Sequence, residues 1–262
     1  MASEVKTNKL SPSTGVTVTL GDASDVFQLP ASAEIDIASG ATLDVNGTID
    51  ITGATTTGFP SSGFVREVFY TASTSAGGYS PNSDVTKIIV EILGGGGGGS
   101  NYGSDGPKVN SGAAGGYVRK TLTVVSTDTM TVTIGDSGAA GGGNGAGSNG
   151  GSTTFASVSG TSFTTLTAGG GTGGTISNYV PGTSGTASGG DLNIIGQGGR
   201  TQNAGSAQGG NSMYGFGGSA RTNEITSIPA DGTGYGSGGG GGADAAYGGA
   251  GAAGLCIITE YK

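Results

Sequence analysis

Short runs of β-branched and aliphatic residues recur along the chain, and glycine, proline, asparagine or serine bounds each of them. The clearest is the run 85–93, Val-Thr-Lys-Ile-Ile-Val-Glu-Ile-Leu. Such runs are typical of strands, and no stretch shows the period of an amphipathic helix. An all-β fold is therefore predicted for the second part of the chain. Its expected strands are Val65–Ser73, Val85–Leu93, Tyr117–Val125, Thr129–Ile134, Thr153–Val158, Phe163–Thr167, Leu192–Ile195 and Leu255–Tyr261.

Six consecutive glycines, 94–99, follow the strongest of these runs directly. A glycine run alone is typical of a flexible linker. The strand pattern immediately before it favours ordered glycine instead, in which the backbone itself is packed. Similar tracts separate the other expected strands, at 138–151, 169–174, 182–190, 196–199, 205–210, 215–218, 232–242 and 248–254.

The spacing within these tracts is not a strict Gly-X-Y repeat, which excludes collagen. Extended helices of the polyproline II type have no internal hydrogen bonds, so buried ones need partners elsewhere. Glycine lacks a Cβ, so such helices can lie side by side and bond to one another. The tracts are therefore predicted to form stacked polyglycine, polyproline-II-type helices on a β-framework.

The amino-terminal part has a different pattern. Alternation at 16–20 predicts a strand, and 31–53 repeats an Ile/Leu-Asp-Ile/Val motif around Asp36, Asp44 and Asp50. Strands this short cannot bury their apolar side alone. An intertwined trimeric β-stalk over residues 31–64 is predicted, with the three aspartates on a solvated face rather than in a calcium site.

Composition supports this division. Only 7 of the 60 glycines lie in residues 1–64. Charged residues make up 11% and the net charge is −8, so the high charge typical of disordered chains is missing. The 10 basic residues provide no footprint for nucleic acid, and no apolar run is long enough for a membrane span. The start lacks the hydrophobic core of a signal peptide, so folding in a cytoplasm is expected.

Catalytic chemistry finds little support. Gly135-Asp136-Ser137-Gly138 matches the nucleophile motif of trypsin-like proteases, but the chain has no histidine to act as the base. Zero histidines and one cysteine argue against zinc and haem, so no metal and no cofactor are expected. Paired carboxylates for glycoside hydrolysis stay open as an alternative. Cys256 lies in an apolar run and is expected to be a small buried residue.

Aromatic residues in glycine-rich loops are the candidates for binding. Tyrosine among glycine, serine and asparagine is the composition of antibody paratopes. For each ring, contact with a ligand and packing against the glycine core are equally compatible with the sequence. The candidate receptor-binding residues are Tyr102, Tyr179, Tyr214, Phe216 and Tyr235.

The segments 85–99, 112–125, 130–143 and 248–261 resemble the glycine-rich C-terminal domain of bacteriophage tail-fibre proteins. They are also similar in style to the tip adhesins of T-even long tail fibres, whose layered polyglycine helices carry variable receptor-binding loops. The start, from Asn8 to Asp22, resembles that of short fibre proteins in marine phages. The stalk predicted for this chain departs from the T-even arrangement, in which the adhesin sits on a separate fibre protein.

The resemblance implies a homotrimeric virion fibre that is not an enzyme and is assembled in the host cytoplasm. Residues 1–30 would attach it to a tail or capsid protein, and residues 31–64 would form the stalk. Residues 65–262 would bind a bacterial surface glycan or an outer-membrane protein, without nucleic acid and without membrane insertion. Two alternatives stay open: a capsid-mounted head fibre or decoration protein, and a glycine-rich ice-binding or matrix protein.

Overall fold

The computed structural model describes residues 63–102, 108–177, 179–203, 207–219, 229–243 and 247–262. All of them belong to the second of the two units into which the chain divides, Gly58–Lys262. The predicted attachment segment 1–30 and nearly all of the predicted stalk 31–64 lie outside the described residues, so both stay predictions. No helix of the described part is long and apolar enough to cross a membrane.

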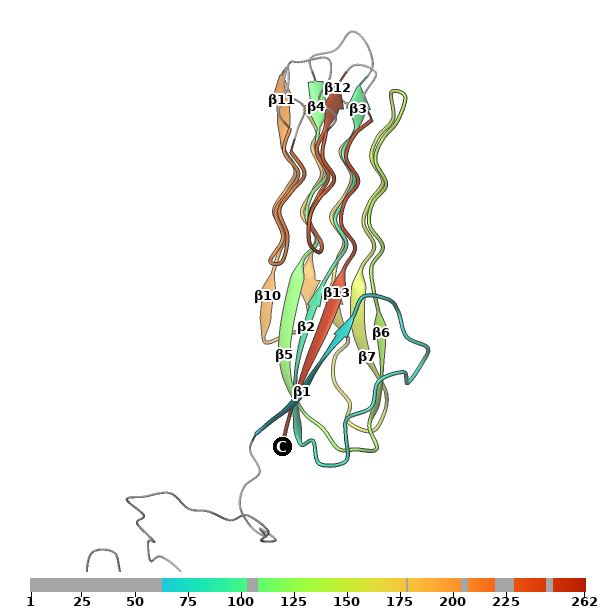
Figure 1. The fold of residues 1–262 in the computed structure, drawn as a ribbon, viewed down its shortest axis with the longest axis vertical. Coiled ribbons are helices and arrows are strands. Elements are labelled where there is room, and N and C mark those ends of the chain that lie inside the picture. Colours follow the sequence, from blue (N-terminus) through green and yellow to red (C-terminus); the bar gives the residue numbers. More distant parts are fainter. Residues whose placement is uncertain (1–62, 103–107, 178, 204–206, 220–228, 244–246) are drawn as a thin grey trace, which may run out of the picture. The chain divides into compact units, whose positions relative to one another are not determined.

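Five antiparallel strands form the larger sheet, in the order β1-β13-β2-β5-β10 (Figure 1). Their bounds are β1 Phe64–Tyr70, β2 Lys87–Leu93, β5 Tyr117–Thr123, β10 Leu192–Ile194 and β13 Leu255–Tyr261. The strand with the strongest sequence pattern, β2, lies at the centre and pairs along its whole length with β13 and with β5.

Four further strands form the smaller antiparallel sheet, and the two sheets enclose the main core. The bounds are β6 Thr129–Thr133, β7 Thr153–Ser159, β8 Leu166–Ala168 and β9 Ala187–Ser188. Alternate residues of β2, Ile88, Val90 and Ile92, are buried in one cluster with Phe155 and Leu166 of the smaller sheet. This alternation is the period of two that a strand imposes on its side chains.

The prediction of an all-β fold is confirmed, and the described residues contain no helix. All eight expected strands are present, with ends that differ by a few residues because side-chain pattern does not mark where pairing stops. Strand β9 and four short strands far from the sheets were not predicted. Cys256 is fully buried in the main core and free of any disulfide, as expected.

Glycine-rich segments continue the strands and run side by side away from the two sheets (Figure 1). We call them the glycine bundle. β2 continues into segment 94–100, and segment 111–116 leads back into β5. The remaining segments are 135–141, 145–152, 169–174, 181–186, 196–200, 207–211, 215–219, 229–233, 236–242 and 248–254.

The N–H groups of segment 94–100 are bonded in a three-residue cycle. Successive residues donate to three different segments, 111–116, 145–152 and 248–254, and then the order repeats. The acceptors are the carbonyls of Gly116, Gly151 and Ala252 in the first cycle and of Ala113, Ser148 and Gly249 in the second. All six N···O distances lie between 2.8 and 3.0 Å, so no N–H of Gly94–Gly99 lacks a partner.

The carbonyl groups of the same segment follow the same cycle with three other segments. Residues 95–100 accept in turn from segments 169–174, 135–141 and 236–242, at 2.8 to 2.9 Å. The donors are Gly171, Gly138 and Gly239, and then Gly174, Gly141 and Gly242. Segment 94–100 is thus bonded on all sides to other segments of the bundle.

Steric exclusion explains why this segment is all glycine. A Cβ at Gly96 would lie 1.9 Å from the carbonyl oxygen of Ser237, and one at Gly99 would lie 1.9 Å from that of Gly240. Real Cβ atoms essentially never come within 3.0 Å of another heavy atom. The six glycines permit close approach of backbones and do not act as a flexible linker.

Segments at the margin of the bundle need glycine only at every third position. In segment 135–141, Gly135, Gly138 and Gly141 are buried, whereas Asp136 and Ser137 are exposed. The match to the protease motif follows from this spacing. Segment 181–186 shows the same order, with buried glycines at 182 and 185 and exposed threonines at 183 and 186.

Four short strands lie at the end of the glycine bundle that is far from the sheets (Figure 1). We call this the far end. β3 pairs in parallel with β12, and β4 pairs antiparallel with β11. Their bounds are β3 Asn101–Tyr102, β4 Lys108–Asn110, β11 Thr201–Asn203 and β12 Gly242–Ala243.

Candidate functional site

The structure divides the five candidate binding residues into two groups. Tyr102 and Tyr179 lie at the far end, whereas Tyr214, Phe216 and Tyr235 lie at the base of the glycine bundle, next to the larger sheet. The sequence could not separate the groups because both sit in the same composition of glycine, serine and asparagine.

At the far end, Tyr179 lies in the turn that joins segments 169–174 and 181–186. Its backbone has φ of 60°, in the left-handed region that bulky residues seldom adopt, and 53% of the residue is exposed. The side-chain amide of Asn110 in β4 donates to the carbonyls of Thr175 and Ser177, at 2.7 and 2.8 Å. The turn is thereby tied to the short strands. For Tyr102 the structure describes the backbone alone.

At the base, Tyr214 and Tyr235 form a β-bridge and cover the outer face of the larger sheet. Tyr235 packs on a small cluster of Leu93, Tyr117 and Leu255, which lie in one row across β2, β5 and β13. The rings of Tyr214 and Tyr117 meet edge to face, with centroids 6.1 Å apart. Part of each ring therefore serves packing, so only the exposed portions are available to a ligand.

Glu91 joins the two phenols. The hydroxyls of Tyr117 and Tyr214 both donate to its Oε1, that of Tyr214 at 3.3 Å. Burial, followed by the hydrogen bond to Glu91, raises the pKa of Tyr117. Burial and the charge of Glu91 raise the pKa of Tyr214. Both phenols stay protonated, and the cluster holds the turn on the sheet.

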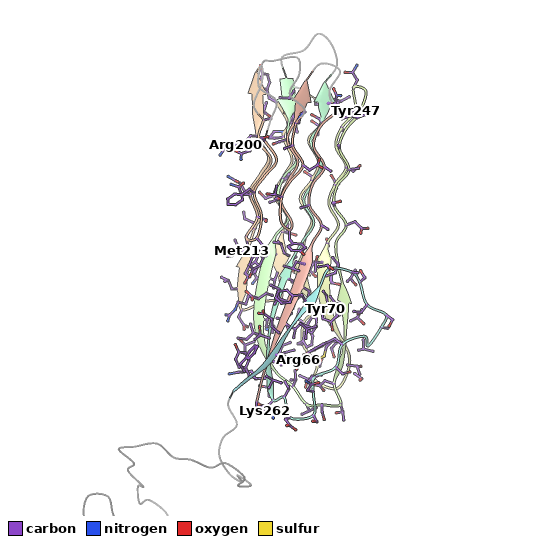
Figure 2. All side chains as sticks on the ribbon, in the orientation of Figure 1. Arg66, Tyr70, Arg200, Met213, Tyr247 and Lys262 are labelled. Carbon is purple, nitrogen blue, oxygen red and sulfur yellow. The ribbon has the colours of Figure 1, made fainter. Side chains whose placement is uncertain are left out.

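Beside this cluster, apolar side chains are exposed at the edge of the sheet. Phe216 is 75% exposed, Ile195 68% and Met213 48%. Figure 2 shows Met213 where the glycine bundle meets the larger sheet, whereas Arg200 and Tyr247 lie further along the bundle. Exposed apolar residues gathered in one place mark interaction sites more often than isolated ones do.

A groove of about 370 Å³ opens beside Ile195 and Met213, and we call it the base groove. Tyr117, Ile194, Ile195 and Met213 contribute its apolar lining, and Gln197, Asn211 and Ser212 contribute polar groups. None of these residues is among the binding candidates predicted from the sequence, where Tyr117 was expected only as the first residue of a strand. The sequence did contain one sign of this groove, the pair Ile194-Ile195 directly before a glycine. Two adjacent large apolar residues are unusual in an edge strand that is exposed to water.

The described part presents an exposed apolar groove, and no catalytic arrangement is recognisable among its residues. Its residues include no group of histidine, cysteine, aspartate or glutamate that could hold a metal ion. The buried carboxylate of Glu260 accepts two hydrogen bonds from Arg66, at 2.7 and 2.8 Å, and one from Tyr79 at 3.0 Å. Those bonds join β1 to β13, which is a structural role. Burial raises the pKa of Cys256, so its thiol stays protonated.

Comparison with known families finds a match over most of the second part of the chain. A model described as a glycine-rich domain matches residues 71–261, which is more than half of the chain. The chain therefore belongs to the glycine-rich domain family. The search of curated proteins found no match.

Proposed function

We propose that the protein is a bacteriophage virion fibre that recognises the host surface through its glycine-rich domain and performs no catalysis. The observation that carries the proposal is the glycine bundle. Its segments are bonded to one another through their backbones, and the short strands β3, β4, β11 and β12 lie at the end of the bundle that is far from the sheets. Such a scaffold can hold loops outward while the loop sequences vary, because the bundle depends on their side chains very little.

In this proposal the segments of the bundle are polyglycine helices of the polyproline II type. The support is the cycle of hydrogen-bond partners in segment 94–100, which repeats at the three residues per turn of such a helix. The absence of room for a Cβ at Gly96 and Gly99 supports it further.

Three chains would form the fibre through the stalk predicted at residues 31–64, and residues 1–30 would attach it to the virion. Several tips on one particle would strengthen a weak interaction with a surface glycan or an outer-membrane protein. A mass measurement in solution tests the stalk. Three chains of 24.8 kDa give about 74 kDa, whereas a mass of 24.8 kDa contradicts the trimer.

Adhesion is tested with the fluorescently labelled full chain on a panel of bacterial isolates. The proposal expects saturable binding to particular strains, and unlabelled protein should compete with phage adsorption on those strains. Serum albumin labelled in the same way serves as the control. Absence of strain-specific binding across a broad panel would count against adhesion.

A further inference from the structure

The base groove combines an apolar lining with two side-chain amides. Ile194, Ile195, Met213 and the ring of Tyr117 supply the lining, and Gln197 and Asn211 supply the amides. Both amide residues are exposed. Mostly apolar lining with a few oriented polar groups is the usual character of a small-molecule site, and about 370 Å³ falls near the lower end of its size range.

Internal hydrogen bonds fix the orientation of both amides. The backbone N–H of Asn211 donates to Oε1 of Gln197 at 2.8 Å, and the backbone N–H of Gly217 donates to Oδ1 of Asn211 at 2.8 Å. A backbone N–H needs an acceptor, so each amide must turn its oxygen towards the protein. The two NH₂ groups are then left to donate elsewhere.

Oriented NH₂ donors beside apolar side chains suit a ligand that carries acceptor oxygens on a ring with an apolar face. A pyranose has both. The net charge of −8 disfavours acidic ligands, since the field of the whole protein repels them. We propose that the base groove binds an uncharged saccharide unit, with its apolar face on Ile194, Ile195 and Met213 and its hydroxyls accepting from Gln197 and Asn211.

This inference deepens the proposed function, on which it rests, because it names the class of surface molecule and a subsite for it. It places that subsite at the base of the bundle. The loops at the far end would be a separate contact.

The test uses the full chain and four probes: the methyl pyranosides of glucose, galactose, mannose and N-acetylglucosamine. Saturation-transfer NMR should detect binding of at least one of them. The variants Gln197→Glu and Asn211→Asp keep the oxygens that accept from the backbone and remove the NH₂ donors. Each should weaken binding about three- to tenfold, as expected for loss of a hydrogen bond at an exposed site.

Asn149→Asp is the matched control. Oδ1 of Asn149 also accepts from a glycine N–H, that of Gly173 at 3.0 Å, but the residue lies outside the base groove. This variant adds the same charge and keeps the same kind of internal bond, so its affinity for the probe should equal that of the unaltered protein. Equal losses in Asn149→Asp and Asn211→Asp would overturn the assignment, as would absence of binding by all four probes.

Adhesion to cells separates this inference from the proposed function. If the unaltered protein and a double variant that combines Gln197→Glu with Asn211→Asp adhere equally and no pyranoside binds, the saccharide site is wrong and the adhesin stands. If a pyranoside binds in the base groove but no strain is bound, the adhesin is wrong. If adhesion needs the two amides and is destroyed by protease treatment of the cells but not by periodate, the ligand is a protein and the saccharide assignment falls.

Discussion

The two-sheet sandwich and the glycine bundle belong to one continuous chain but are held together in different ways. In the sandwich, side chains such as Ile88, Ile92 and Phe155 fill the space between the sheets, and hydrophobic burial stabilises the fold. In the bundle, the backbones of neighbouring segments lie so close that no side chain fits between them at Gly96 or Gly99. Backbone hydrogen bonds and the contacts between backbones replace the side-chain core.

The effect of glycine on stability differs between the two regions. Glycine usually weakens a fold because it loses the most conformational entropy on folding. In the bundle that loss is offset, because every N–H from Gly94 to Gly99 gains a backbone acceptor. The sandwich fixes the base of the bundle, since its strands hold the ends of the glycine segments in register. The comparison teaches that a glycine run can be a packed element when strands fix its ends.

The largest expected effect comes from one methyl group in the bundle. Gly96→Ala would place Cβ 1.9 Å from the carbonyl oxygen of Ser237, so the backbones must separate and their hydrogen bonds must break. We expect a loss of about 3 kcal/mol or more in the free energy of unfolding, above the usual cost of overpacking. Urea denaturation followed by circular dichroism measures it.

Gly198→Ala is the matched control within the bundle. The nearest atom to a Cβ there is Oγ of Ser184 at 3.6 Å, an ordinary contact. Its stability should be unchanged or about 0.4–1 kcal/mol higher, because alanine restricts the unfolded chain. Equal destabilisation by the two substitutions would contradict the packing argument.

A smaller effect is expected in the sandwich from Glu260→Gln. The change removes the charge that accepts from Arg66 and Tyr79 in a fully buried position. We expect a loss of about 1.5–3 kcal/mol in the free energy of unfolding, typical of hydrogen bonds to a charged group. The control is Glu67→Gln on the exposed side of β1, where a change within about 0.5 kcal/mol is expected. Similar losses at the two positions would show that Glu260 has no special role.

The smallest effect is a loss of stability at alkaline pH. Burial, with the nearby charge of Glu260, raises the pKa of Tyr79 above its ordinary value of 10.0, and burial with the Glu91 bond does so for Tyr117. The unfolded chain therefore releases these protons at a lower pH than the folded protein does. Stability should be full below pH 10 and should fall as the pH rises further. Urea titrations from pH 8 to 11 measure the slope, which should be shallower in Tyr79→Phe; an identical slope in that variant would contradict the assignment.

The sequence was informative where side chains determine structure. The eight main strands followed from runs of β-branched and aliphatic residues, because these runs become the buried faces of the sheets. The order of the strands was not predictable, since β1 pairs with β13 across nearly the whole domain. No hydrophobic pattern marks the short strands β3, β4, β11 and β12 in the sequence. Strand pairs of two or three residues form only because their neighbours in space hold them together.

The candidate binding surfaces were only partly predictable. Aromatic residues such as Tyr179 and Phe216 stood out by composition, and the structure finds both exposed. The base groove did not stand out, because Gln197 and Asn211 are separated by 14 positions and meet only where segments 196–200 and 207–211 lie side by side. The spacing of buried glycines in segment 135–141 was present in the sequence, but it acquires meaning only when the neighbouring segments are known.

Amide hydrogen exchange of Gly94–Gly99 tests most directly whether the glycine bundle is packed. Each N–H donates to a backbone carbonyl of another segment at 2.8 to 3.0 Å. The account predicts slow exchange across all six residues, with protection comparable to that of Ile88–Leu93 in β2, because both stretches open only when the domain unfolds. Fast exchange throughout Gly94–Gly99, beside a protected β2, would show that the run is a flexible linker and would contradict the account.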